Sequence, residues 1–308
     1  MSNLAPIPTF TLSSGAKIPA LALGTWESPP EVVATAVASA IKAGYRHIDT
    51  AAIYGNEEGV GSGIKQAIEQ TGVKRSELFI TTKLWLQDFH NVPKALDTSL
   101  EKLFPGDKDA YVDLYLMHWP IGLTPDGKLD ESISFNEVWA ELEKLPESKT
   151  RDIGISNFTI ANVKKLLATA KKTPVVNQVE LHTTLPQFKL VDFLLSGKYG
   201  FPAHDGKVIL PEAYSPLARG NLDDPVVAKI AEKYGVSPAN IVLSWGIHRN
   251  TVVLPKSVTP QRIVDNLKYV KLDKEDLDTL EELAKKSPLH RHCGMDVFDV
   301  FNDNEDSK

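Results

Sequence analysis

Short runs of apolar, often β-branched residues alternate along this chain with longer segments whose apolar residues recur every three or four positions. The first pattern is typical of buried strands and the second of helices that bury one face. The segment from Ser28 to Gly44 is helical in this sense, with Ser28 as a candidate N-cap and Gly44 as a candidate C-terminal stop. One face of this expected helix carries six apolar residues: Val32, Val33, Ala36, Val37, Ala40 and Ile41.

The same strand and helix pairing recurs along the chain. If Leu21 belongs to the first strand, eight strand-like runs are each followed by a helical pattern. The later strands are expected at His47–Ile48, Leu78–Thr82, Val112–Met117, Asp152–Ile155, Val175–Leu181, Val208–Ala213 and Thr251–Leu254. The helices after them are expected at Val60–Ile68, Val92–Leu103, Val138–Leu145, Ile160–Ala170, Leu190–Leu195, Val226–Tyr234 and Arg262–Val270.

Eight strand–helix units joined by right-handed crossovers predict a (β/α)8 (TIM) barrel of about 250 residues, an α/β fold. We expect one domain over residues 1–308, with the barrel at about 10–283 and a C-terminal loop and tail at 284–308. An N-terminal β-hairpin around Ser14–Gly15 is expected to plug the bottom of the barrel. We also expect an additional helix at Val236–Leu243 and a frayed acidic end at Asn302–Lys308.

The main alternative is a doubly wound dinucleotide-binding fold. That fold places a glycine-rich phosphate turn directly after the first strand. The corresponding place holds Gly24-Thr25-Trp26, without a second or third glycine. The run Gly59-Val60-Gly61-Ser62-Gly63 has Ile64 at the third glycine position and no strand before it, so we interpret it as the small face of a helix. The barrel is therefore favoured.

Composition narrows the possible partners. The net charge of −6 argues against nucleic acid or an anionic membrane as the main partner. The single cysteine, Cys293, excludes an internal disulfide and suits a reducing compartment. We see no secretory signal and no apolar stretch of the roughly 20 residues that a membrane span needs. We expect a cytoplasmic protein with a small-molecule partner, and a monomer, with a dimer left open.

Four polar residues lie at or just after the ends of strand-like runs. Asp49, Lys83 and His118 end or follow three of these runs, and Tyr54 comes five residues after Asp49. Barrel enzymes carry their chemistry at this end of the strands. We expect Lys83 to lower the pKa of the Tyr54 phenol, Asp49 to keep Lys83 charged, and His118 to donate a hydrogen bond to a carbonyl oxygen. Any one of them alone would be interpreted as a satisfied buried polar residue. Together they indicate a metal-free, proton-donating site for a carbonyl.

Several motifs resemble the signatures of the aldo-keto reductases. The segment Gly44–Ala51, with Tyr54, Asn56 and Glu57, is similar to the first signature of that family. Three further segments resemble later signatures, in order and with family-like spacing: Leu116–Pro120, Ile153–Phe158 and Leu254–Ser257. The similarity extends from about Phe10 to Leu283 and is closest to the fungal-type carbonyl reductases.

The resemblance implies a role for each of the four residues. Tyr54 is implied as the general acid, assisted by Lys83 and Asp49, and His118 as the group that orients the carbonyl. NADPH is implied as the hydride donor, with NADP+ as its product.

The resemblance also implies a cofactor site. The family places the adenosine 2′-phosphate at the start of the helix near Pro260, which implies Lys256, Ser257, Thr259, Arg262 and Asn266. A capped surface helix is the alternative for this segment alone. Because two cations suit a phosphate better than a ribose hydroxyl, NADPH is favoured over NADH.

Further positions match the family's nicotinamide site. Ser156, Asn157 and Gln178 match residues that hold the carboxamide, and Tyr214 matches the ring that stacks on the nicotinamide. The other implied cofactor contacts are Thr25, Trp26, Ser215 and Leu217.

Three tryptophans are expected to form the walls of the substrate pocket: Trp26, Trp85 and Trp119. Packing at the barrel rim is the alternative. The segment His290–Cys293 lacks a convincing set of metal ligands, so we expect a solvated loop and no metal.

The sequence thus predicts an NADPH-dependent carbonyl reductase. The loop between Pro120 and Trp139 is shorter than in the mammalian aldose-reductase branch by about ten residues. We expect this shortened rim to leave an open pocket for bulky ketones or keto esters as well as aldehydes. Two alternatives stay open: an NADPH-binding redox-sensor subunit with low turnover, and a barrel lyase or hydrolase without nicotinamide.

Overall fold

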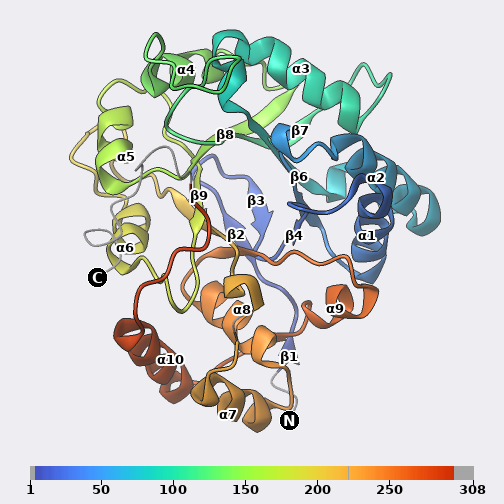
Figure 1. Ribbon diagram of the computed structural model, residues 1–308, viewed down its shortest axis with the longest axis vertical. Helices are drawn as coiled ribbons and strands as arrows, with labels where there is room; N and C mark the ends of the chain where they lie inside the picture. Colours follow the sequence, from blue (N-terminus) through green and yellow to red (C-terminus); the bar gives the residue numbers. More distant parts are fainter. Residues whose placement is uncertain (1–3, 221, 295–308) are drawn as a thin grey trace.

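The computed structural model describes residues 4–220 and 222–294, and its centre is a ring of eight parallel strands surrounded by helices (Figure 1). The strands pair in the order β11-β10-β9-β8-β7-β6-β5-β4. They are β4 (Leu23–Gly24), β5 (His47–Asp49), β6 (Phe79–Leu84), β7 (Val112–Met117), β8 (Thr150–Ser156), β9 (Val176–Glu180), β10 (Leu210–Tyr214) and β11 (Val252–Leu254). Parallel bridges from Leu21 to Val253 and from Gly24 to Lys256 join the first strand to the last. The predicted (β/α)8 barrel is therefore confirmed.

The surrounding helices follow the strands in chain order. They are α1 (Pro30–Ala43), α2 (Glu57–Thr71), α3 (Val92–Leu103), α4 (Phe135–Leu142), α5 (Ile160–Leu167), α6 (Phe188–Ser196), α7 (Pro225–Tyr234), α8 (Pro238–His248), α9 (Pro260–Asp265) and α10 (Lys274–Lys286). The additional helix expected at Val236–Leu243 is α8, and α10 extends the chain beyond the barrel. No helix among the described residues combines the length and the apolar character that crossing a membrane requires.

The N-terminal hairpin closes one end of the barrel. It consists of β2 (Thr9–Thr11) and β3 (Lys17–Pro19), which lie across the middle of the ring in Figure 1. Its residues Leu12 and Ile18 share an apolar cluster with Phe79, Val176 and Leu210, each the first residue of a barrel strand. The N-terminal end of the barrel is thus filled with side chains, as predicted.

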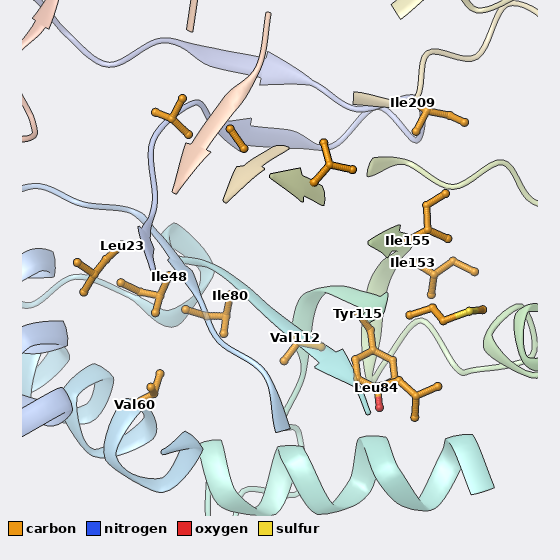
Figure 2. Packing of buried hydrophobic residues seen from close by; sticks show 14 of the residues in the cluster. Leu23, Ile48, Val60, Ile80, Leu84, Val112, Tyr115, Ile153, Ile155 and Ile209 are labelled. Atoms are coloured by element: carbon orange, nitrogen blue, oxygen red, sulfur yellow. The ribbon is translucent and has the colours of Figure 1, made fainter. Parts of the chain in front are cut away.

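A second apolar layer lies between the strands and the helices. Along β7 the side chains alternate: Leu114 and Leu116 join the interior cluster, whereas Tyr115 and Met117 belong to the outer one. Figure 2 shows Tyr115 in this outer layer with residues of neighbouring strands, and Val60 of α2 facing the same layer. Both faces of the sheet are therefore covered by side chains, and almost all residues of the barrel strands are buried.

The glycine run of α2 allows close helix packing. A Cβ atom on Gly63 would lie 2.4 Å from the carbonyl oxygen of Ala34 in α1, and one on Gly61 would lie 2.1 Å from that of Leu103 in α3. The run is the small face of a helix, as we interpreted it from the sequence.

Two local predictions are wrong. The helix α1 begins after Pro29, and Ser28 does not cap it; the Ser28 carbonyl instead accepts a hydrogen bond from Asn56 Nδ2 at 3.0 Å. The helix expected to reach Val270 ends at Asp265, because Tyr269–Val270 forms β12 and pairs with β1 (Leu4–Ala5). The second error comes from a contact between residues far apart in the sequence. The expected frayed end at Asn302–Lys308 lies outside the described residues.

Replacing Gly61 by alanine should destabilise the protein by about 1–3 kcal/mol, because the new methyl group has no space beside the Leu103 backbone. Urea unfolding followed by circular dichroism measures this change. Ser62→Ala, at the exposed next position of α2, is the control and should change the unfolding free energy little. Equal stability of the two variants would contradict the close contact between α2 and α3.

Candidate active site

Four predicted catalytic side chains meet at the C-terminal end of the barrel strands. Asp49 is the last residue of β5, Lys83 lies one residue before the end of β6, and His118 directly follows β7. Tyr54 ends the short 3-10 helix η1 (Ala52–Tyr54). The hairpin closes the opposite end of the barrel, so the four groups face the open end.

The ammonium group of Lys83 is fully buried and has three hydrogen-bond acceptors. Its Nζ donates to Asp49 Oδ2 at 2.8 Å, to the Thr50 carbonyl at 2.8 Å and to the Tyr54 hydroxyl at 3.2 Å. An ammonium has three N–H donors, so each donor of Lys83 has a partner. The side chain is therefore held in one orientation toward the Tyr54 oxygen.

Burial and the neighbouring groups have opposite effects on the pKa of Lys83. Burial alone would lower the pKa of Lys83, but Asp49 and Tyr54 outweigh it and leave the pKa above its ordinary value, so Lys83 is charged. Burial raises the pKa of Tyr54, and the opposing effect of Lys83 does not reverse this increase, partly because Asp49 also raises it. Lys83 therefore lowers the pKa of Tyr54, as expected from the sequence, but its effect is smaller than that of burial.

His118 is neutral and firmly placed. Its burial, together with the charge of Lys83, holds the pKa of its imidazole well below the ordinary value. Its backbone N–H donates to the Leu84 carbonyl at 3.2 Å, and its carbonyl accepts from Asn157 Nδ2 at 2.9 Å. The His118 ring lies edge-on to Tyr54 and to Trp85, with centroid distances of 5.9 and 5.3 Å. A neutral imidazole has one N–H that can donate to a substrate oxygen.

A cavity of about 980 Å³ opens above these groups. Most predicted site residues line it: Trp26, Asp49, Tyr54, Trp85, His118, Trp119, Asn157, Gln178, Tyr214, Ser215, Leu217, Lys256, Ser257, Arg262 and Asn266. Lys256 and Arg262 are exposed cations on its wall, near α9. The cavity therefore extends from Asp49, Tyr54 and His118 to an end that carries these two cations.

Four predicted residues do not line the cavity but lie around it. Thr25 Oγ1 donates to the Asp49 carbonyl at 3.0 Å, and Ser156 Oγ donates to the Gln178 carbonyl at 2.8 Å. The Thr259 amide donates to Ser257 Oγ at 3.1 Å. Lys83 lies beneath the Tyr54 hydroxyl. The first three contacts orient neighbouring parts of the wall.

Two amide side chains, those of Asn157 and Gln178, form hydrogen bonds that link different strands in the wall of the cavity. The Tyr214 hydroxyl donates to Asn157 Oδ1 at 2.7 Å, and Asn157 adopts a left-handed backbone conformation with φ of 64°. The Gln178 Nε2 donates to Asp49 Oδ1 and to Glu212 Oε2, both at 2.8 Å. Glu212 was not among the site residues predicted from the sequence. Its signal was a single acidic residue in the strand-like run Leu210-Pro211-Glu212-Ala213-Tyr214.

The segment His290–Cys293 is not a solvated loop, and that prediction is wrong. The backbone N–H groups of His292 and Cys293 donate to the two carboxylate oxygens of Glu180 at 2.7 and 2.8 Å. His182 Nε2 lies 2.8 Å from Glu180 Oε1. His292 and Cys293 line the cavity, so this segment forms part of its wall. The docking of this segment depends on a residue in β9, more than a hundred positions earlier in the chain.

Comparison with known proteins finds relatives that match most of the chain. Residues 20–285 match the model of the Aldo/keto reductase family. A glycerol 2-dehydrogenase (NADP(+)) of Saccharomyces cerevisiae is 42% identical over 318 residues, which cover 95% of this chain and 96% of that protein. The methylglyoxal reductase DkgA of Yersinia pestis is 42% identical over 282 residues, covering 90% of this chain and 92% of the relative.

Solved structures show the same similarity. An aldo-keto reductase of Bombyx mori, in complex with NADP, superposes with a TM-score of 0.80 at 35% identity, covering 92% of this chain and 98% of the other. The aldose reductase of Schistosoma japonicum gives a TM-score of 0.82 at 33% identity, covering 93% and 94%. With its barrel, the cluster around Lys83 and a match that covers most of its length, the chain belongs to the aldo/keto reductase family.

Proposed function

We propose that the protein reduces aldehydes and ketones to alcohols with NADPH, and that Tyr54 is the proton donor. The main support for this proposal is the buried Lys83 ammonium, which donates hydrogen bonds to Asp49 and to the Tyr54 hydroxyl at the floor of the cavity. A phenol with a raised pKa keeps its proton at neutral pH until a carbonyl oxygen accepts it. The phenolate that remains is then stabilised by the charge of Lys83, 3.2 Å away.

His118 completes the site for a carbonyl. Its neutral imidazole can donate a hydrogen bond to the substrate oxygen without competing with Tyr54 as a strong acid. The tryptophans Trp85 and Trp119 border the same cavity and provide apolar walls for the rest of the substrate. Tyr54 and His118 therefore act on one oxygen atom from two sides.

The cavity also fits the cofactor. Its exposed cations, Lys256 and Arg262, suit the adenosine 2′-phosphate, and the polar wall formed by Asn157 and Gln178 suits the nicotinamide carboxamide. When bound, NADPH supplies the hydride. Two relatives support the same cofactor for this chain: the Saccharomyces cerevisiae protein is a glycerol 2-dehydrogenase (NADP(+)), and the Bombyx mori aldo-keto reductase is in complex with NADP.

The mouth of the cavity favours bulky ketones or keto esters alongside aldehydes. Trp26 and Ile53 both line it, and they are 39% and 46% exposed. Because these apolar side chains are exposed at the mouth, a large substrate can contact them there. We expect a panel of carbonyl compounds to oxidise NADPH steadily, including aromatic ketones and keto esters. Turnover of small sugars alone would contradict the open pocket, and tight NADPH binding without any turnover would favour a redox-sensor subunit.

Tyr54→Phe should retain NADPH binding and lose most turnover, by about 10²-fold or more, because phenylalanine keeps the ring but cannot donate a proton. Stopped-flow absorbance at 340 nm gives the turnover, and quenching of tryptophan fluorescence gives the NADPH affinity. An unimpaired rate would remove Tyr54 as the acid.

Lys256→Ala should raise the KM for NADPH about tenfold while changing the KM for NADH little, because only NADPH carries the 2′-phosphate. Lys229→Ala removes an exposed lysine of α7 and is the matched control for the loss of one surface charge. Equal effects of Lys256→Ala on the two cofactors would exclude the assigned phosphate contact.

A further inference from the structure

Glu212 is a fully buried acid beneath the candidate active site. It lies in the middle of β10, where its register partners are Gln178 on β9 and Val252 on β11. The Gln178 Nε2 donates to Glu212 Oε2 at 2.8 Å and to Asp49 Oδ1 at the same distance. Asp49 binds Lys83, which binds Tyr54. A continuous series of hydrogen bonds thus connects Glu212 to the proposed proton donor.

These bonds restrict the Gln178 amide to one orientation. An amide nitrogen has two N–H donors, and both are used by the two carboxyl groups. If the amide rotated by half a turn, its oxygen would face Asp49 Oδ1, and the hydrogen bond that Asp49 accepts would be replaced by repulsion between two oxygens. Because Gln178 lines the cavity, its carbonyl oxygen remains as the acceptor that the side chain offers to a ligand.

We propose that Glu212 is a positioning residue of the hydride-transfer site: it fixes the Gln178 amide, and through it holds Asp49 in place beside Lys83. This inference rests on the proposed reductase function. With NADPH bound, the fixed Gln178 oxygen would be the group that accepts a hydrogen bond from the nicotinamide carboxamide. Glu212 itself touches neither cofactor nor substrate.

The protonation state of Glu212 agrees with this role. Burial, followed by the charge of Asp49, raises the pKa of the Glu212 carboxyl to about 8, with Gln178 and Lys83 acting in the opposite direction. Its Oε1 is buried without a hydrogen-bond partner among the described residues, a position that favours a neutral acid over a charged carboxylate. Neither register partner, Gln178 or Val252, titrates, so the charges acting on Glu212 are those of Asp49 on β5 and Lys83 on β6.

A pH dependence follows. As the pH rises through about 8, Glu212 loses its proton and a second negative charge appears beside Asp49. Negative charge near a phenol raises its pKa, so Tyr54 becomes a weaker acid. The turnover number for carbonyl reduction should therefore fall on the alkaline side of pH 8.

Two substitutions separate the positioning role from simple packing. Glu212→Gln keeps an oxygen that accepts from Gln178 and cannot ionise, whereas Glu212→Leu has a similar volume and no acceptor. We expect Glu212→Gln to retain most of the turnover at pH 7 and to lose the alkaline decline near pH 8. Glu212→Leu should raise the dissociation constant of NADPH and lower kcat, each by about tenfold at pH 7.

The measurements are kcat and KM between pH 6 and 10, NADPH affinity by tryptophan fluorescence, and folding by circular dichroism. Asp152→Asn is the control, because it removes another buried carboxyl with a raised pKa, bonded to Ser14 and not lining the cavity. It should leave the pH profile unchanged.

Several results would overturn the inference. They are wild-type NADPH affinity and kcat in Glu212→Leu, an unchanged alkaline decline in Glu212→Gln, or loss of that decline in Asp152→Asn. Unfolding of Glu212→Leu would leave the decision to the Glu212→Gln profile. If the wild type binds NADPH without reducing carbonyls, the proposed function fails, and the NADPH affinities of the two Glu212 variants still decide the positioning of Gln178. If the wild type does not bind NADPH at all, both proposals fail.

Discussion

The arrangement of this barrel end depends on one buried positive charge, the ammonium of Lys83. Removing such a charge from water is unfavourable unless it is paired and fully hydrogen-bonded, and deleting one partner of a buried pair typically destabilises a protein by about 3–5 kcal/mol. Lys83 has Asp49 as its counter-ion, and the Thr50 carbonyl and the Tyr54 hydroxyl complete its hydrogen bonds. The need to satisfy the ammonium therefore places the phenol of Tyr54 within its reach. The hydrogen bonds that stabilise the buried charge of Lys83 thus also orient the hydroxyl of Tyr54, the proposed acid.

The barrel makes this arrangement possible by joining strands that are distant in the chain. Asp49 and Lys83 lie on the neighbouring strands β5 and β6, while Gln178 reaches Asp49 across the barrel from β9. The hairpin fills the opposite end with Leu12 and Ile18, so the cluster around Lys83 can open only toward the C-terminal end of the barrel. Between the two lies an apolar layer that includes Leu114 and Leu116. The barrel thus separates a stabilising end from a reactive end.

The features that could be predicted from the sequence are those that depend on local periodicity or on which residue follows a strand. The eight strand–helix units follow from periodicity, and the meeting of Asp49, Lys83 and His118 follows from their positions after parallel strands. The error at the end of α9 arose because a distant segment pairs there: β1 pairs with Tyr269–Val270. The raised pKa of Tyr54 depends on the depth of burial, which periodicity does not measure. Glu212 was not predicted because an acidic residue in a strand is normally expected at the surface. The sequence does not show which side of the strand faces the interior of the barrel.

Two carboxyl groups near the site, those of Glu180 and Glu212, differ in their protonation, and the difference follows from their partners. Burial would raise the pKa of Glu180, but His182 and the backbone N–H groups of His292 and Cys293 outweigh it and hold the pKa below its ordinary value. Glu212 has one amide donor and remains a neutral acid at neutral pH. Since Glu180 fastens the 290–293 segment that forms one wall of the cavity, an ionised carboxylate shapes the pocket while a neutral one supports its floor. The number of donors around each carboxyl, rather than its depth alone, decides which role it takes.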